Sequence, residues 1–316
     1  MKGRFIVSLD CEGKWGMADK LQPYHDRLLT DEALARVYED IVDLFERHEI
    51  AATFAFVLAF TMDESERARF ARLFEIEDFV GDVWLSHFRK ARQQGRLGGW
   101  FQPRALDTVQ RRARHEIACH GFCHRSLADR AARPTDAATE LDAAETVAQS
   151  KGLSLQTLVY PRNAVGNLRA LVQKGYLGFR DERPRPPGRL GPIKSMVDEL
   201  NLWPQPEAPA RGTYGDIVRI PAGNFFNWRF GPRRLVPPAV TVRRWTTLLN
   251  RAADTGGVAH LWFHPHNLIT GPETREPLEA VLKHASRLAR MGRLEVVTQE
   301  AYCRQEMARH ERKRDD

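Results

Sequence analysis

Short, almost continuously apolar runs alternate along the chain with longer segments in which apolar residues recur every three or four positions. The first pattern is typical of strands buried on both faces of a parallel sheet, and the second of helices packed against it. Strands are predicted at residues 5–9, 51–60, 155–160, 177–179, 217–220, 258–263 and 294–297, and in the run that leads into His120. Helices are predicted at residues 31–48, 64–74, 134–151, 168–174, 241–253 and 275–290, and from about residue 298 onward.

Strands and helices alternate throughout the 316 residues, without an internal repeat or a recognisable linker. This order predicts a parallel sheet wrapped by helices. We therefore expect an α/β fold, a distorted or incomplete (β/α) barrel, that forms a single domain over residues 1–316. Its core would span residues 4–298, with loop insertions such as residues 75–105 near the mouth of a site. Residues 299–316 would add a C-terminal helix and a charged tail.

Polar residues follow four of the predicted strands. In barrels of parallel strands, the chemistry takes place at the carboxyl ends of the strands. The residues at these ends are Asp10 and Glu12, His120 and His124, Arg162 and Asn163, and His264 and His266. Because these ends meet at one face of a barrel, we expect the side chains to form a common site.

His120 and His124, four positions apart at a strand end, suggest a metal site. Neutral imidazoles suit a divalent ion such as zinc, although such a pair can also be structural. Asp10 and Glu12 lie two positions apart, so their side chains share one face of a strand. Two carboxylates there are unfavourable without a cation between them, so we expect one to bind an ion and the other to take a proton. Zinc is the preferred ion, with Co²⁺, Ni²⁺ or Fe²⁺ as alternatives, and the same ligands could hold iron in an oxygenase.

Cys119 and Cys123 offer a rival zinc site of mixed cysteine and histidine ligands. It is disfavoured because Cys119 should point away from His120 on a strand, and no second cysteine pair completes a structural tetrad. Arg162 is either a surface arginine or the cation that keeps a carboxylate base ionised and aligned. His264 follows an apolar strand, where a histidine can donate a proton to a leaving group.

Four segments in this order resemble motifs of the polysaccharide deacetylases of carbohydrate esterase family 4, the NodB-homology family. They are Ser-Leu-Asp-Cys-Glu-Gly at 8–13, His-Glu-Ile-Ala-Cys-His-Gly-Phe-Cys-His at 115–124, Tyr-Pro-Arg-Asn at 160–163 and Leu-Trp-Phe-His at 261–264. The resemblance covers roughly residues 5–297 and implies a distorted, incomplete (β/α) barrel. Within the family, the forms Tyr-Pro-Arg-Asn at 160–163 and Phe-His-Pro-His-Asn at 263–267 resemble the branch linked to lipopolysaccharide and O-antigen sugar biosynthesis.

The resemblance also implies a role for individual residues. It makes Asp10 the catalytic base, His264 the general acid and Arg162 the residue that aligns the base. The implied metal ligands are Glu12, His120 and His124, with a glutamate at the position where the family usually has an aspartate. Trp203 and Trp228 are the candidates for a tryptophan that supports the acid histidine in the family.

The charge and composition of the chain limit the classes of binding partner that we expect. The net charge of +7 and a pI near 9.4 favour phosphorylated, carboxylated or lipid-headgroup partners. The arginines are spread along the chain without a nucleic-acid-binding pattern, so no nucleic-acid partner is expected. No apolar run approaches the roughly 20 residues of a membrane span, although transient contact with the inner-membrane surface is possible. The four cysteines form no disulfide framework and no signal peptide is apparent, so we expect a cytoplasmic protein.

These expectations combine into a metal-dependent hydrolase that removes an N-acetyl or N-formyl group from an amino sugar, on a nucleotide- or lipid-linked intermediate of surface-polysaccharide synthesis. Candidate substrate-binding residues are Trp15, Trp100, Asn163 and His266. The indole rings could stack on a sugar or pack in the core, and His266 could equally be structural. The alternatives are an allantoinase-like hydrolase of a non-sugar amide, a non-catalytic glycan-binding protein with a relict site, and the iron oxygenase.

Overall fold

The computed structural model describes residues 2–75, 84–183, 200–209, 213–214 and 216–315. Its centre is one ten-stranded sheet with the order β6-β7-β5-β4-β3-β2-β1-β9-β8, in which β10 also pairs with β1. The antiparallel pair β6–β7 is the exception among otherwise parallel neighbours. The strands are β1 (Gly3–Cys11), β2 (Thr53–Phe56), β3 (Glu116–Cys119), β4 (Thr157–Val159), β5 (Gly178–Arg180), β6 (Thr213–Tyr214), β7 (Ile217–Ile220), β8 (Asn224–Phe225), β9 (Val258–Phe263) and β10 (Leu294–Val297).

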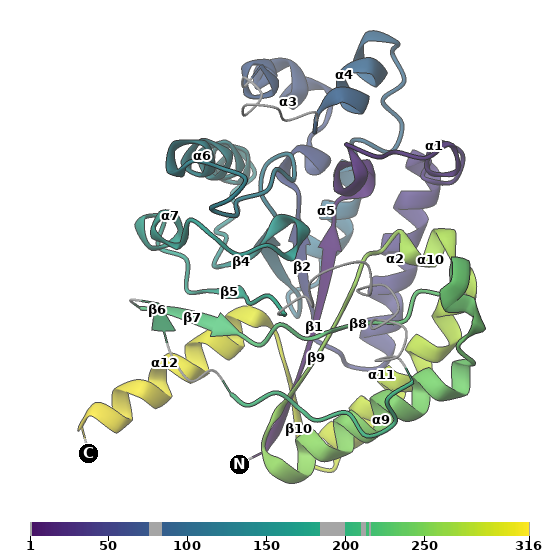
Figure 1. Ribbon diagram of the computed structural model, residues 1–316, viewed down its shortest axis with the longest axis vertical. Helices are drawn as coiled ribbons and strands as arrows, with labels where there is room; N and C mark the ends of the chain where they lie inside the picture. The colour runs from purple at the N-terminus through teal and green to yellow at the C-terminus, as the bar shows by residue number, and fades with distance from the viewer. Residues whose placement is uncertain (1, 76–83, 184–199, 210–212, 215, 316) are drawn as a thin grey trace.

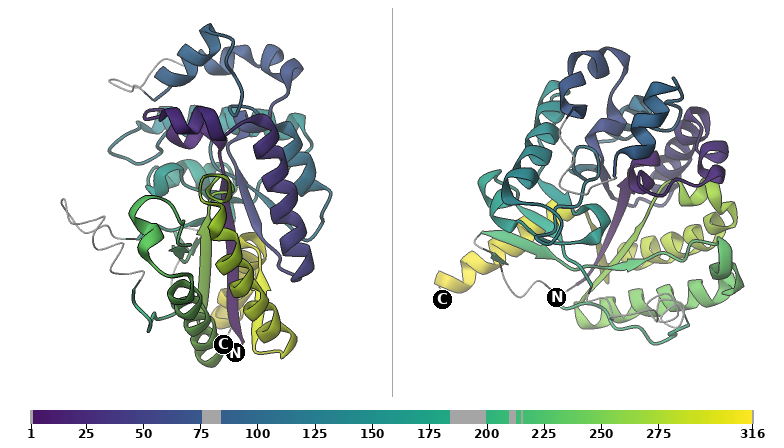
Figure 2. Two further views of the ribbon diagram at one scale, coloured as in Figure 1. Left: turned by 90° about the vertical axis from the view of Figure 1, so that its right-hand side faces the viewer. Right: turned by 45° about the horizontal axis from the view of Figure 1, so that its top comes forward.

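The sheet curls into a half-barrel with helices around it, which confirms the predicted incomplete α/β barrel (Figures 1 and 2). Within the described chain, β6 and β8 are the two ends of the sheet and do not pair with each other. The helices are α1 (Pro23–Leu28), α2 (Asp31–Arg47), α3 (Glu64–Arg69), α4 (Ser86–Gln93), α5 (Pro103–Gln110), α6 (Pro134–Ser150), α7 (Leu168–Gln173), α9 (Pro238–Thr255), α10 (Asn267–Thr270), α11 (Arg275–Arg290) and α12 (Gln299–Asp315).

The strand β1 is the axis of this arrangement. All nine of its residues are buried, and it pairs with β9 along one edge and with β10 and then β2 along the other. Strands buried on both faces read as continuous apolar runs, and this one is apolar from Phe5 to Val7 and again at Leu9. The carboxyl end of β1 lies inside the sheet, between the ends of β2 and β9.

Several predicted boundaries differ from those in the structure, and two of the differences have a clear physical reason. The apolar run at 51–60 was expected to be one strand, but β2 ends at Phe56 and residues Leu58–Thr61 form a 3-10 helix. The backbone N–H groups of Leu58 and Ala59 donate instead to the carbonyls of Gly121 and Phe122, at 3.0 and 2.9 Å. The charged stretch 310–316 was expected to be a tail, but α12 continues to Asp315 because arginine, lysine and glutamate are good helix formers.

Above the carboxyl end of the sheet, α3 and α4 form a cap (Figure 1). Beneath this cap, Trp15 packs against Phe88 and Trp100 with ring centroids 4.5 and 5.1 Å apart. The indole N–H of Trp15 donates to the backbone carbonyl of Trp100 at 2.6 Å. The cap thus has its own aromatic core, which fixes the segment that follows β1. Part of the predicted insertion 75–105, residues 76–83, lies outside the described residues.

Candidate metal centre and catalytic site

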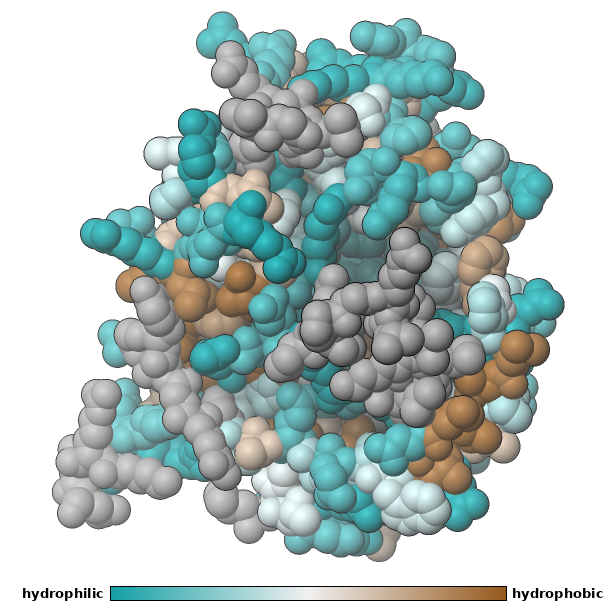
Figure 3. Space-filling view, in the orientation of Figure 1, coloured by the Kyte–Doolittle hydropathy of each residue, from teal (hydrophilic) through white to brown (hydrophobic). Residues whose placement is uncertain are grey.

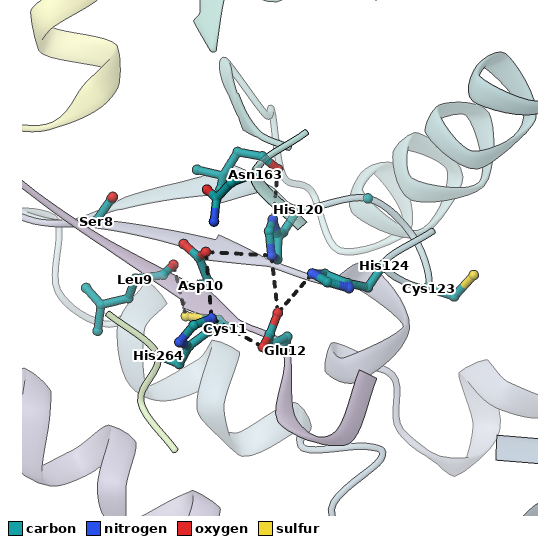
Figure 4. Close-up of polar contacts among 12 residues, drawn as sticks. Ser8, Leu9, Asp10, Cys11, Glu12, His120, Cys123, His124, Asn163 and His264 are labelled. Atoms are coloured by element: carbon teal, nitrogen blue, oxygen red, sulfur yellow. Dashed lines mark hydrogen bonds and ion pairs between the residues drawn. The ribbon is translucent and has the colours of Figure 1, made fainter. Parts of the chain in front are cut away.

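The site begins with two carboxylates at the end of β1. Asp10 and Glu12 are 2% and 4% exposed, and their side chains point to the same side, as their spacing of two predicts. The strand β9, which pairs with β1, brings His264 to the same place, and β3, which is separated from β1 by β2 alone, brings His120 (Figure 4). Residues that are 100 or more positions apart in the sequence therefore meet because the carboxyl ends of their strands lie on the same side of the sheet.

The side chains of Glu12, His120 and His124 converge on one point. The Oε2 atom of Glu12 lies 3.0 Å from Nε2 of His124 and 3.3 Å from Nε2 of His120. The three ligand atoms all lie within 4.8 Å of one another, and all three side chains are buried. The predicted convergence of Glu12, His120 and His124 is thus present in the structure.

These distances fit a divalent ion. Two ligand atoms each about 2.1 Å from an ion are about 3.0 Å apart at a right angle and about 3.4 Å apart at a tetrahedral angle. The separations between Glu12 and the two histidines lie in this interval. Two imidazoles and one carboxylate are also the donor set of hydrolytic zinc sites that keep a position open for water. The residues present therefore fit the metal that the sequence predicted, and they leave the identity of the ion open.

The histidines are oriented by their other ring nitrogens and by the backbone. The Nδ1 atom of His120 lies 2.8 Å from the carbonyl of Val159, so Nδ1–H donates there and Nε2 presents its lone pair to the site. His124 adopts the left-handed conformation with φ 61°, and Gly121 precedes it with φ 79°. A non-glycine residue in this region is strained, which indicates a loop held by surrounding contacts.

The carboxylate of Glu140 on α6 supplies those contacts. Its Oε1 atom accepts backbone N–H bonds from Phe122 at 2.9 Å, Cys123 at 2.8 Å and Arg125 at 3.3 Å. Glu140 is 1% exposed, so these donors have no access to water as an alternative partner. One buried carboxylate therefore holds the loop that carries both histidines.

Replacing Glu140 by alanine should lower the free energy of unfolding by about 3 kcal/mol, because three buried N–H groups lose their carboxyl acceptor. Zinc affinity should fall together with stability, since the loop no longer fixes His124. Glu140→Gln is the matched control, because its amide oxygen can still accept and should retain most of both properties. Urea unfolding and zinc titration of the two variants test this, and equal stability of Glu140→Ala and the parent would contradict it.

The partner of Asp10 is Arg180, the last residue of β5. Its guanidinium makes two hydrogen bonds to the Asp10 carboxylate, each 2.7 Å long. Ser8 accepts a further bond from Arg180 at 3.1 Å, and the Ser8 hydroxyl lies 2.8 Å from Nε2 of His260. Because Nδ1 of His260 lies 2.6 Å from the Pro221 carbonyl, Nδ1–H donates there and Nε2 accepts from Ser8. Asp10 is therefore held by a hydrogen-bonded chain that runs through Arg180 and Ser8 to His260.

The expectation that Arg162 aligns Asp10 is corrected by these contacts. Arg162 instead donates to Asp19 at 2.6 Å and lies over the ring of Trp84, with 40% of its side chain exposed. It has φ 62° and the next residue, Asn163, has φ 49°, so the chain turns sharply and carries the guanidinium away from Asp10. Asn163 remains near the site (Figure 4). Its amide oxygen accepts a hydrogen bond from Arg180.

Arg180→Ala should reduce the turnover of the parental substrate by about 100-fold, because Asp10, the expected base, loses the ion pair that orients it. Stability should also fall, by about 3 kcal/mol, since the carboxylate is left unpaired in the interior. Arg180→Lys should recover only part of the rate, because one ammonium cannot reproduce the two parallel bonds. Arg162→Ala is the control and should change the rate less than about 3-fold. Steady-state kinetics and thermal unfolding of the three variants measure this, and a larger loss in Arg162→Ala than in Arg180→Ala would reverse the assignment.

His264 lies across the site from His124. Its Nε2 atom is 3.5 Å from Oε1 of Glu12 and 3.9 Å from Oδ2 of Asp10. Both its backbone N–H and its ring Nδ1 face Oδ1 of Asn267, at 3.0 and 3.2 Å. Asn267 thereby holds the tautomer in which Nδ1 carries a proton, and Nε2 points to the carboxylates. His266 stacks on His264 with ring centroids 4.9 Å apart.

Burial and neighbouring charges shift the pKa values of the side chains in the site. Burial alone would raise the pKa of Glu12, but His264 and His124 more than offset it, so the pKa lies well below its usual range. Burial likewise opposes ionisation of Asp10, yet Arg180 and His120 hold its pKa below the usual value. Burial lowers the pKa of His124, and it lowers that of His266 to about 3. The site therefore contains ionised carboxylates, with His124 and His266 neutral.

Two residues that were predicted to contact the substrate, Trp15 and Trp100, are not positioned to do so. Trp15 and Trp100 are fully buried in the aromatic core of the cap, where neither ring can stack on a sugar. The rings that do lie beside the site are Phe225 and Trp262, with Phe225 5.8 Å from His264 and 4.7 Å from Trp262. Neither tryptophan proposed to support the acid histidine contacts it: Trp203 is 65% exposed, and Trp228 stacks on Phe230.

Arg180, Asn267 and Glu140 were missed by the reasoning from sequence. Arg180 directly follows the predicted strand at 177–179 and is the last residue of β5, so the rule that found the histidines applies to it as well. Asn267 stands three positions after His264, in a turn where an asparagine side chain commonly bonds the preceding backbone. Glu140 lies within a helix pattern, and nothing in its local sequence marks it.

Most of the surface viewed in Figure 3 is hydrophilic, with scattered hydrophobic patches. The large hydrophobic side chains that are exposed among the described residues are Val172, Leu200, Trp203, Leu235 and Met291. None of the helices in the described part of the chain has the length and apolar character of a membrane span.

No protein-family model and no curated protein sequence matches this chain. Solved structures do share its fold. A candidate polysaccharide deacetylase from Mycobacterium smegmatis superposes with a TM-score of 0.56 at 15% identity, covering 98% of this chain and 92% of its own. The PuuE allantoinase gives 0.52 at 11% identity, with coverages of 97% and 91%. A GH57 branching enzyme from Thermococcus kodakaraensis gives 0.53 at 14% identity, with coverages of 95% and 70%. At these identities the likeness establishes the fold, and the function has to be argued from the site.

Proposed function

We propose that this protein is a metal-dependent hydrolase of the polysaccharide deacetylase type that removes an N-acyl group from an amino sugar. The observation that carries the proposal is the arrangement at the end of β1. Glu12, His120 and His124 surround one point, while Asp10 and His264 flank it on the same side. This arrangement supplies a metal site, a base and an acid within a few ångströms of each other.

A divalent ion held by Glu12, His120 and His124 would polarise the amide carbonyl and lower the pKa of a water molecule. Asp10 accepts the proton of the attacking water through Oδ2, the atom that faces His120 and His264. Arg180 keeps that carboxylate ionised and fixed. His264, when protonated at Nε2, donates a proton to the nitrogen of the departing amine. Its position is held by Asn267.

The names of two solved structures of the same fold, a deacetylase and an allantoinase, are consistent with hydrolysis of an amide. A sugar substrate is supported by the rings of Phe225 and Trp262, which lie next to His264 where the departing amine would be. The allantoinase fold also favours a second candidate, hydrolysis of a linear or cyclic non-sugar amide. We place zinc first among the ions because it prefers mixed imidazole and carboxylate ligands.

The net charge of +7 supports a substrate that carries phosphate. We therefore propose a nucleotide- or lipid-linked amino sugar, of the kind used in lipopolysaccharide or O-antigen synthesis, and a cytoplasmic protein. A neutral polymer would gain nothing from this charge. Transient contact with an anionic membrane surface would follow if the carrier is a lipid.

Mass spectrometry of candidate substrates tests the proposal. Protein with one equivalent of zinc is incubated with N-acetyl and N-formyl nucleotide-sugars, the corresponding neutral sugars and allantoin. We expect release of acetate or formate with the free amine from a nucleotide-sugar, loss of this activity after chelation, and recovery with zinc. Hydrolysis of allantoin alone would favour the second candidate. Binding of sugars without hydrolysis of any substrate would instead indicate a glycan-binding protein, and oxygen consumption with ferrous iron would indicate an oxygenase.

A further inference from the structure

The carboxylate of Glu12 faces two different pairs of histidines. Its Oε2 atom faces His120 and His124, at 3.3 and 3.0 Å. Its Oε1 atom faces the opposite way, 3.5 Å from Nε2 of His264. Ligand atoms of Glu12, His264 and His266 lie within 4.8 Å of one another, as those of the first group do. Carboxylates that bridge two ions use their oxygens in this manner, with the ions about 3.5–4 Å apart.

His266 is the unexplained member of the second group. It is 7% exposed and stacks on His264 with an angle of 24° between the rings. The rings of His120 and His260 contact backbone carbonyls, whereas both ring nitrogens of His115 are buried without a partner among the described residues. Within the described residues, no hydrogen bond reaches the ring of His266 either, but its nitrogens are not among the fully buried unpaired atoms, so they are open to a ligand. A ligand would supply the missing interaction.

We propose that Glu12 Oε1, His264 and His266 form a second divalent-cation site beside the first, and that its occupation inhibits the enzyme. The inhibitory part of this inference rests on the proposed function. When an ion occupies the lone pair at Nε2 of His264, that nitrogen can no longer carry the proton that the amine needs. The same histidine would then serve catalysis at low metal concentration and metal binding at high concentration.

The second site should be the weaker of the two. Both ions would share one carboxylate, and two divalent cations a few ångströms apart repel each other. Asp10 offsets part of this repulsion, because its Oδ2 atom lies between the positions, 4.0 Å from His120 and 3.9 Å from His264. Much of the Asp10 charge is already compensated by Arg180. The side chain of His264 is 21% exposed, so an ion can reach it from solvent.

Equilibrium dialysis against zinc measures the number of ions bound. The parent protein should bind two, the second at least about 10-fold more weakly than the first. His266→Asn should bind one ion with the affinity of the first site, which also shows that this variant is folded. The control His284→Asn changes a histidine on α11 that pairs with Asn250, and it should still bind two. A parent that binds one ion at saturating zinc, or a His266→Asn variant that still binds two, would overturn the proposal.

Hydrolysis measured over a range of zinc concentrations tests the inhibition. The parental rate should rise up to one equivalent and then fall at least about 5-fold as the second site fills. Each rate is expressed relative to that variant's own rate at one equivalent, and His266→Asn should show no fall. An undiminished parental rate with two ions bound would refute inhibition. Two bound ions without hydrolysis of any amide would count against the proposed function and leave the second site standing.

Discussion

Replacing Asp10 by asparagine is expected to slow hydrolysis of the N-acyl amino sugar by about 1000-fold while leaving zinc bound. The asparagine has the same shape as aspartate but cannot accept the proton of the attacking water. Because Glu12, His120 and His124 are unchanged, the ion should bind with affinity close to that of the parent. Paired measurements of hydrolysis by mass spectrometry and of zinc binding by titration therefore separate the base from the metal ligands.

Two control measurements are needed to interpret the activity of Asp10→Asn. Asp10→Asn leaves Arg180 without an ionised partner, so thermal unfolding must show that the variant is folded at the assay temperature. The variant Arg162→Ala serves as a control with an intact base, because its side chain contacts Asp19 rather than Asp10. If Asp10→Asn hydrolyses the substrate at the parental rate, Asp10 is not the base.

The second large effect is expected from His120→Ala, which should lose both zinc and hydrolysis. In the proposed site His120 would contribute Nε2 to the ion, and it is fixed by Val159 through Nδ1, so its removal would take away one of three ligands. Losing a residue that only orients a ligand typically costs 10–100-fold in metal affinity, so loss of the ligand itself should cost more than about 100-fold. Hydrolysis should fall below detection at one equivalent of zinc.

His115 provides a matched control for this variant, because it precedes the same strand and packs between rings without touching the site. Its ring centroid lies 5.2 Å from that of Phe54 and 6.0 Å from that of Phe45. His115→Ala should therefore reduce stability while zinc binding and the rate per folded molecule stay unchanged. Retention of zinc by His120→Ala would show that the ion sits elsewhere.

Much of the fold and the outline of the site could be predicted from local patterns. The strand at 258–263, the helix at 275–290 and the strand at 294–297 have the predicted bounds, because each is a clean apolar or amphipathic run between turns. Since the carboxyl ends of parallel strands meet at one face, polar residues at those ends were expected together. Glu12, His120, His124, Asp10 and His264 do come together in the structure.

Contacts between distant segments could not be predicted in the same way. Arg180 and Asp10 are 170 positions apart, and three strands separate β5 from β1 in the sheet, so they meet only because the sheet curls into a half-barrel. Arg162 looked suitable because it follows a strand, but two left-handed residues in succession turn its side chain outward. Trp15 and Trp100 lie in loops by sequence, and their burial depends on the cap that covers them. Burial and turn geometry of this kind are tertiary properties.

Anomalous diffraction at the zinc edge, from crystals of the protein loaded with one equivalent of zinc, tests the central claim most directly. We predict one strong peak bounded by Oε2 of Glu12 and the Nε2 atoms of His120 and His124, each at about 2.1 Å. A peak at Cys119 or Cys123, or the absence of a peak at the end of β1, would contradict the account.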